Sequence, residues 1–227
     1  PNWSVDGTRR GPICGEPVNV YTKEQLQKMT VDEINEAIRR DLYEDAYERQ
    51  MKEPKRYKGK HLAHCMENLL FICPVCGKTE TIFSQEDRVM CKACNLSFRY
   101  NEYGMLEDAP FTTVKELSAW QKEAVRKAVL QGEVYTSPQG TLAQVSKHQE
   151  TLIDKGAVSM SEEAICCGNT RIRMKDILGM EMHGKHALVF STQQGYYEMI
   201  IETNVLKYLL FFEAYCRMLH DQAVVSE

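Results

Sequence analysis

Two stretches in the first 132 residues repeat their apolar positions with the period of an α-helix. From residue 30 to about Gln50 the apolar side chains form one stripe and charged residues fill the other faces, which predicts a helix that ends before Pro54. A longer stripe after Thr113 predicts a second helix, of about 18 residues, that ends at Gly132. The stripes consist of Ile34, Ala37, Ile38 and Leu42, and of Leu117, Trp120, Ala124, Val125, Ala128 and Val129.

Three capping boxes mark helix starts. Thr22-x-x-Gln25, Thr30-x-x-Glu33 and Thr113-x-x-Glu116 each place a hydroxyl three residues before a Glu or Gln. In a capping box each of these side chains bonds the backbone N–H of the other residue, which satisfies two donors at the helix end. The boxes therefore support both predicted helices and add a short helix after Thr22.

From residue 133 to residue 204 the helical period gives way to short strand-like runs between turn residues. Seven runs at roughly ten-residue spacing predict a small antiparallel β barrel or sandwich. A last helix is predicted from Asn204, its N-cap, to about Leu219. In element order this region resembles a pleckstrin-homology-like (PH-like) or GRAM-like domain. The predicted strands are residues 140–146, 151–154, 157–160, 164–167, 170–174, 187–191 and 196–201, with turns at 155–156, 168–169, 183–184 and 194–195.

Four of the nine cysteines form two C-x-x-C pairs. Cys73–Cys76 and Cys91–Cys94 lie among strand-like runs at residues 79–83 and 97–100, with a turn at residues 85–87. Zinc binds four thiolates tetrahedrally, and two such pairs on facing hairpins supply that geometry. The pattern predicts a zinc ribbon that holds one structural Zn²⁺. Its predicted ligands are Cys73, Cys76, Cys91 and Cys94.

Two other uses of the cysteine pairs are open alternatives. A redox dithiol usually has a single C-x-x-C near a βαβ pattern, and this stretch has two pairs among short strands. A catalytic zinc ion keeps one ligand position for water, whereas four thiolates fill all four positions. Gly77 and Asn95, each directly after a pair, are expected to take the left-handed turn that aims backbone amides at sulfur.

Composition and charge exclude several classes of protein. Of 227 residues, 43% are hydrophobic and 26% are charged, which is typical of a globular chain and not of a collagenous, disordered or integral-membrane one. The net charge of −4 lacks the basic excess of a general nucleic-acid binder. An odd number of cysteines argues against a disulfide framework and favours a reducing compartment. The longest apolar runs, residues 69–72 and 208–212, are too short to span a bilayer.

A basic run occupies residues 49–60, where Glu53 is the one acidic residue. Pro54 and Gly59 mark the run as a loop or linker, and a solvated linker is the simplest interpretation. The functional alternative is contact with anionic lipid headgroups, which is worth about 1 kcal/mol for each Lys or Arg near the surface. The basic residues of the run are Arg49, Lys52, Lys55, Arg56, Lys58 and Lys60.

Other candidate sites are weaker. The run Asp6–Arg9 resembles the end of a phosphate-binding E-G-T-R motif but lacks the buried strand and the Pro-Glu that precede Gly in that motif. His61 and His64 have the spacing of a helical metal pair, but no carboxylate is placed to complete a site, so solvated or capping histidines are expected. Three basic residues alternate within residues 171–175 and form a local basic patch. No catalytic residue is predicted.

Motifs in the first 60 residues resemble one protein family. Trp3-Ser4 with RRG (9–11), MTVDEIN (29–35), RDLYEDAY (40–47) and YKGK (57–60) resemble the C-terminal part of clostridial-type, PlsC-like lysophospholipid (1-acylglycerol-3-phosphate) acyltransferases. In that family the extension continues with a zinc ribbon and a β-rich PH-like tail, so the resemblance covers the whole chain. The family's catalytic H-x-x-x-x-D and F-P-E-G-T-R motifs are absent here, and no catalytic residue carries over.

The resemblance implies a non-catalytic accessory role in phospholipid biosynthesis. The chain begins Pro1-Asn2-Trp3 and is expected to be part of a longer acyltransferase that transfers an acyl chain from acyl-CoA or acyl carrier protein to a lysophospholipid. The implied partners are the upstream acyltransferase domain and a membrane surface or acyl carrier, at the cytoplasmic inner face of the membrane; nucleic acid is not expected. The rival hypothesis is a stand-alone zinc-ribbon adapter that binds protein or nucleic acid.

These patterns together predict an α+β chain of several domains. Residues 1–20 are expected to be the tail of an acyltransferase domain, and residues 21–68 a helical linker segment. The zinc ribbon is expected at residues 69–108 and a connecting helix at residues 109–132. Residues 133–227 are expected to form the PH-like β domain with its C-terminal helix.

Overall fold

The computed structural model describes residue 3, residues 15–147 and residues 149–225. The features predicted within residues 4–14 lie outside these. The chain forms two compact units, which we call the helical unit (residues 15–59 and 102–104) and the main unit (Trp3, residues 60–101 and 105–225). The predicted ribbon, connecting helix and β domain thus lie in one compact unit, and the predicted boundaries between them stay predictions.

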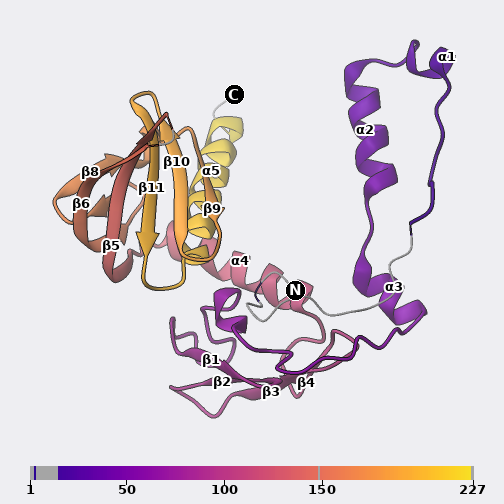
Figure 1. Cartoon of the computed structure of the whole chain (residues 1–227), viewed down its shortest axis with the longest axis horizontal. Helices are drawn as coiled ribbons and strands as arrows, with labels where there is room; N and C mark the ends of the chain where they lie inside the picture. Colours follow the sequence, from indigo (N-terminus) through magenta and orange to yellow (C-terminus); the bar gives the residue numbers. More distant parts are fainter. Residues whose placement is uncertain (1–2, 4–14, 148, 226–227) are drawn as a thin grey trace. The chain divides into compact units, whose positions relative to one another are not determined.

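The helical unit contains three helices in the described residues, α1 (Lys23–Leu26), α2 (Val31–Leu42) and α3 (Ala46–Lys52) (Figure 1). The capping boxes at Thr22 and Thr30 form as predicted. In each box the threonine hydroxyl accepts a bond from the N–H three residues on, and the Gln or Glu side chain accepts one from the threonine N–H at 2.7 Å.

The helix predicted to reach Gln50 is instead two helices with a break after Leu42. Tyr43 leaves the helical region with a ψ of 123°. Asp45 then starts α3 as its N-cap, because its carboxylate accepts a hydrogen bond from the Tyr47 N–H at 2.9 Å. Side-chain bonding to the local backbone competes with continued helix at such positions, so the apolar period alone overestimates the helix length.

The main unit begins with a one-turn 3₁₀ helix, η1 (Met66–Asn68), and a small antiparallel sheet. Its strands β1 (Ile82–Gln85), β2 (Arg88–Cys91), β3 (Ser97–Tyr100) and β4 (Leu106–Glu107) follow one another in space as in sequence. Alternate side chains face a small core, as expected for a sheet with one buried face. That core includes Ile82, Val89, Phe98, Tyr100 and Leu106.

A long helix, α4 (Val114–Leu130), follows the ribbon sheet. Its capping box at Thr113 and the left-handed Gly132, with a φ of 71°, confirm both predicted ends. The buried face carries Leu117, Val125, Ala128 and Val129 of the predicted stripe. Gln121 is buried on the same face, which an apolar pattern does not indicate.

An antiparallel sheet of seven strands and a closing helix make up the rest of the described main unit. They are β5 (Tyr135–Ser146), β6 (Gln149–Met160), β7 (Ala164–Cys167), β8 (Thr170–Arg173), β9 (Gly179–His183), β10 (Ala187–Thr192), β11 (Gly195–Ile201) and α5 (Leu206–Val225), with the 3₁₀ turn η2 (Met174–Asp176) after β8. The spatial order is β8-β7-β6-β5-β11-β10-β9, so pairing of β5 with β11 joins two meanders. Figure 1 shows the curled sheet beside α5, which packs along α4 and against β9.

The number of strands agrees with the prediction, but two strands differ. The runs 151–154 and 157–160 belong to one strand, β6, and β9 was not predicted. Gly156 lies inside β6 and makes no turn. A Cβ at this position would come within 2.8 Å of the Gly168 Cα, so the missing side chain lets the two backbones approach closely. The short strand β9 alternates methionines with polar residues, and methionine is not a residue typical of strands.

Helix α5 closes the β domain as predicted. Asn204 is its N-cap, since its side-chain oxygen accepts a bond from the Lys207 N–H at 3.2 Å. Tyr208 and Phe211 are fully buried in the domain core. The predicted fold class is therefore confirmed: an α+β chain with a helical segment, a four-cysteine ribbon and a seven-stranded, PH-like domain closed by a C-terminal helix.

Candidate metal centre

The first cysteine pair lies on a tight turn that follows the buried residues 70–72. The Cys73 N–H donates to the Lys78 carbonyl and the Gly77 N–H donates to the Cys73 carbonyl, both at 2.9 Å. Gly77 has a φ of 71°, so the left-handed turn predicted after Cys76 is confirmed.

The second pair lies at the end of β2 and in the turn after it. The Cys91 N–H donates to the Leu96 carbonyl at 3.1 Å, which closes this turn with the same spacing as the first. The Ala93 N–H donates to the Cys91 sulfur at 3.3 Å. Asn95 is not among the residues with positive φ in the described chain, so the left-handed turn expected there is wrong. The second turn closes without it.

The structure brings the four predicted ligands together. All four Sγ atoms lie within 4.8 Å of one another, with 3.6 Å between Cys73 and Cys94 and 3.9 Å between Cys76 and Cys91. Sulfurs bound at about 2.3 Å around a tetrahedral ion are about 3.8 Å apart. A disulfide would need about 2.05 Å, and all four side chains are free thiols. The cluster can therefore hold a metal ion.

The local environment separates the pKa values of the two buried thiols. Burial raises the pKa of Cys73 to about 12. Burial acts on Cys91 in the same direction, but the Thr81 hydroxyl, 3.2 Å from its sulfur, and the Ala93 N–H outweigh it and lower the Cys91 pKa to about 6. Ligand thiols bind a metal ion as thiolates, so an ion that binds this cluster must displace protons from it.

Gln121 of α4 holds the segment that leads into the first pair. Its Oε1 accepts bonds from the N–H groups of Phe71 at 2.9 Å and Ile72 at 3.2 Å, and its Nε2 donates to the Leu69 carbonyl at 2.9 Å. The Gln121 side chain is buried, so it takes the place of water for three backbone groups. The position of Cys73 is thereby tied to α4.

The ribbon and the β domain share one hydrophobic core. Phe71 and Ile72, immediately before Cys73, belong to the same buried cluster as the strands and α5. The Phe71 ring meets the Tyr135 ring edge to face, with centroids 6.2 Å apart, and Tyr135 meets Phe211 at 5.4 Å. Folding of the ribbon is therefore linked to packing of the β domain.

An ion pair between a buried lysine and the more exposed Glu80 adds a second link just after the first cysteine turn. The Glu80 carboxylate lies 2.6 Å from the Nζ of Lys207, which also donates to the Thr136 carbonyl at 2.5 Å. The Lys207 side chain is only 4% exposed, and its ammonium lies 5.0 Å from the centroid of the Tyr208 ring. A buried charge is tolerated only with such partners. Glu80 of the ribbon therefore satisfies a charge buried in the β domain.

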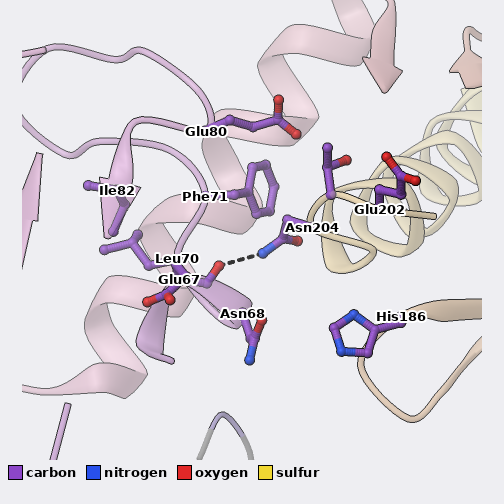
Figure 2. Close-up of a pocket in the computed structure, with 10 residues that line it drawn as sticks. Glu67, Asn68, Leu70, Phe71, Glu80, Ile82, His186, Glu202 and Asn204 are labelled. Carbon is purple, nitrogen blue, oxygen red and sulfur yellow. Dashed lines mark hydrogen bonds between the residues drawn. The ribbon is translucent and has the colours of Figure 1, made fainter. Parts of the chain in front are cut away.

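Beside this link lies an acidic pocket of about 380 Å³ (Figure 2). In Figure 2 the Asn204 side chain points toward Glu67, whose carbonyl accepts its hydrogen bond at 2.6 Å. Sequence reasoning missed this pocket because its lining comes from four separate stretches and matches no local motif. The lining residues are Glu67, Asn68, Leu70, Phe71, Glu80, Ile82, His186, Glu202, Thr203 and Asn204.

The basic run 49–60 is only partly available for a ligand. Arg49 pairs with Glu44 at 2.6 Å, and Arg56 pairs with Glu102. Arg49 and Lys52 lie on α3 and not in a loop. None of the helices in the described residues combines the length and the apolar character needed to cross a bilayer. Contact of this run with anionic lipid stays a prediction, and its remaining basic residues are Lys52, Lys55, Lys58 and Lys60.

The other candidate sites do not assemble. His61 bonds Glu86 at 2.6 Å, and neither it nor His64 joins a cluster of ligands. Within the described residues, the four cysteines are the one group of three or more potential ligands close enough to share an ion. In the basic patch, Arg171 and Arg173 each pair with a carboxylate at 2.6 Å.

Comparison with known proteins shows a distant structural similarity. No protein-family model matches the chain, and no curated protein sequence matches it. Among solved structures, the N-terminal PH domain of the human ARAP2 protein is similar over 42% of this chain and 87% of its own, with 17% sequence identity and a TM-score of 0.29. The PH-like layout of the β domain therefore rests on its own strand order and closing helix.

Proposed function

We propose that Cys73, Cys76, Cys91 and Cys94 hold one zinc ion with a structural role. The convergence of four thiols at tetrahedral spacing supports this most directly. Tetrahedral sulfur ligands suit zinc or iron, and the reducing compartment favoured by the cysteine count keeps the thiols available. Bound zinc would supply a cross-link between the two turns. Four thiolates leave no position for water or substrate, so the chain's own residues use the ion for shape and not for catalysis.

Zinc content is the direct measure of this proposal. Protein purified without chelators is expected to contain one zinc ion per chain by elemental analysis, and to lack the visible absorbance of an iron–sulfur centre. Folded protein with neither zinc nor another metal would contradict the proposal. Iron in place of zinc would keep the site but change its chemistry.

We further propose that the chain is the non-catalytic C-terminal accessory region of a lysophospholipid acyltransferase in phospholipid biosynthesis. The motifs at residues 29–35, 40–47 and 57–60 support this family, together with the order of helical segment, ribbon and β domain. The accessory region would position the catalytic domain at a membrane or recognise the acyl carrier, with the lysines of residues 52–60 as its contact with anionic headgroups.

The contacts of the motif side chains agree with an accessory role. Arg40 donates to the Tyr21 hydroxyl at 2.8 Å, and that hydroxyl donates to Asp41 at 2.5 Å. Asp45 caps α3. The Trp3 ring is buried and meets Tyr100 edge to face, with centroids 5.2 Å apart. These residues hold their own units together.

The coding sequence upstream of Pro1 tests the accessory role. It is expected to contain both the H-x-x-x-x-D and F-P-E-G-T-R motifs within roughly one domain length, about 150–200 residues. An upstream sequence without either motif would contradict the acyltransferase assignment and favour the stand-alone zinc-ribbon adapter. The zinc proposal would be unaffected, because it depends only on the cysteine cluster.

A further inference from the structure

Helix α2 carries an exposed apolar stripe. Val31, Ile38 and Leu42 are spaced seven and four residues apart, which places them on one helix face together with Asn35. Their exposed fractions are 73%, 50% and 78%. Another face of the same helix is covered, since Ala37 is buried. The uncovered stripe is therefore a large apolar surface on a short helix.

An apolar groove runs beside this stripe within the helical unit. It has a volume of about 450 Å³ and lies between α2 and the segment that precedes it. The Tyr21 hydroxyl bonds Asp41 and so fixes that segment against the helix. The groove can receive apolar side chains from a partner. Its apolar lining includes Pro17, Val18, Leu26, Met29, Ile34, Ile38 and Leu42.

The charges at the two ends of one edge of the stripe complement each other. By helical position Asp32, Glu36 and Arg39 lie on the same flank of α2, with the acidic residues toward its start and the arginine toward its end. When two identical helices pack antiparallel about a two-fold axis, the same flanks meet, and the start of one helix faces the end of the other. Arg39 of each copy would then lie opposite Asp32 of the other. The two Glu36 side chains would face each other near the axis, each with the Arg39 of its own helix 3.5 Å away.

We propose that this face of α2 pairs with the same face of a second copy of the chain, with the two helices antiparallel. Val31 of each copy meets Leu42 of the other, and Asn35 and Ile38 lie at the centre. A bilayer is a poorer occupant, because the polar faces of α2 carry Asp32, Glu33 and Glu36, which anionic lipid repels.

The pairing is expected to be weak and sensitive to salt. A helix of 12 residues is about 18 Å long, so α2 and its groove bury less than the roughly 800 Å² per partner of a standard interface. The charged flank is exposed, as the 76% exposed Arg39 side chain shows, and salt screens such contacts. Dimers should therefore form only at high protein concentration.

Sedimentation equilibrium of the full chain over a wide concentration range tests the pairing. We expect a monomer–dimer equilibrium that is at least tenfold weaker in Ile38→Glu/Leu42→Glu. Leu178→Glu is the matched control, since Leu178 is 62% exposed in the main unit, and it should leave the equilibrium unchanged. Circular dichroism checks that each variant is folded. A chain that stays monomeric at every concentration, or equal loss in the control, would overturn the proposal.

Charge reversal tests the antiparallel orientation. Asp32→Lys/Glu36→Lys alone and Arg39→Glu alone should each weaken self-association, because like charges then face each other. A mixture of the two variants should recover dimer, because opposite charges face again. No recovery would overturn the antiparallel geometry. Binding of monomer to phosphatidylglycerol vesicles through the same stripe, without dimers, would overturn the pairing in favour of a membrane.

Discussion

Replacing Cys76, one of the four proposed zinc ligands, or chelating the proposed ion, is expected to unfold the ribbon and to lower the stability of the β domain with it. The ribbon sheet has short strands and a small core of its own, so it is expected to depend on the proposed cross-link between its two cysteine turns. Zinc binding in domains of this kind contributes an apparent free energy of about 10–16 kcal/mol at neutral pH. No other single change in the chain should have an effect of this size.

The effect should reach the β domain because the ribbon supplies part of its interior. Phe71 and Ile72 belong to the shared core, and Glu80 is the charge partner of the buried Lys207. When the first cysteine turn unfolds, the shared core loses packing and the lysine is left buried with one partner fewer. Strands β8 and β9 should respond least, because each lies at an edge of the sheet, three strands away from β5, where Tyr135 meets Phe71 of the ribbon.

Hydrogen exchange and thermal unfolding of Cys76→Ser measure both effects. Zinc content should fall to near zero, protection should be lost from residues 73–107, and the unfolding temperature of the remainder should fall. Cys216→Ser is the matched control, because Cys216 is exposed on α5 and lies outside the cluster. It should keep full zinc content and stability. A zinc-free Cys76→Ser protein with the same protection and unfolding temperature as the control would contradict both the structural role and the link.

Replacing Gln121 with leucine is expected to destabilise the main unit by several kcal/mol. Leucine has a similar volume but cannot bond the N–H groups of Phe71 and Ile72 or the carbonyl of Leu69. Each buried backbone group left without a partner costs about 1–3 kcal/mol. For a chain of this size the unfolding temperature should fall by about 10 °C, since each kcal/mol is worth about 2–4 °C.

The matched control is Gln131→Leu, the same substitution at an exposed position at the end of α4. It should change stability by no more than about 0.5 kcal/mol. Hydrogen exchange should show faster exchange at residues 71 and 72 in Gln121→Leu and not in the control. Equal stability of the two variants would show that the segment before Cys73 does not depend on Gln121.

Features that depend on neighbouring residues were predictable from the sequence. The three capping boxes form between residues three apart, and Gly77 takes its left-handed turn directly after Cys76. The cluster of four cysteines was predictable for a similar reason, because metal chemistry restricts which side chains, at which spacing, can share one ion. The left-handed turn predicted at Asn95 does not form, because the turn after Cys91 closes without it.

Features that depend on distant backbone were not predictable. Gly156 looks like a turn residue in the sequence, yet it lies within β6. Pairing of β6 with β7 brings Gly168 beside it, and only a residue without a side chain allows that approach. Gln121 looks like a surface residue of an amphipathic helix, yet it is buried against three backbone groups about 50 residues earlier in the chain. An apolar period cannot indicate a polar residue whose partners lie on another element.

The sequence by itself determined the helix caps, most of the elements, the set of four cysteines that cluster and the α+β class, because helix caps, strand alternation and cysteine spacing act over short stretches. Tertiary structure alone decided that the ribbon and the β domain are one packed body. That outcome depends on Phe71, Gln121 and the pair of Glu80 with Lys207 meeting across 50 to 127 residues of chain. A buried polar or charged group is costly without a partner, so Gln121 and Lys207 need these contacts, but no local pattern encodes which partners will meet.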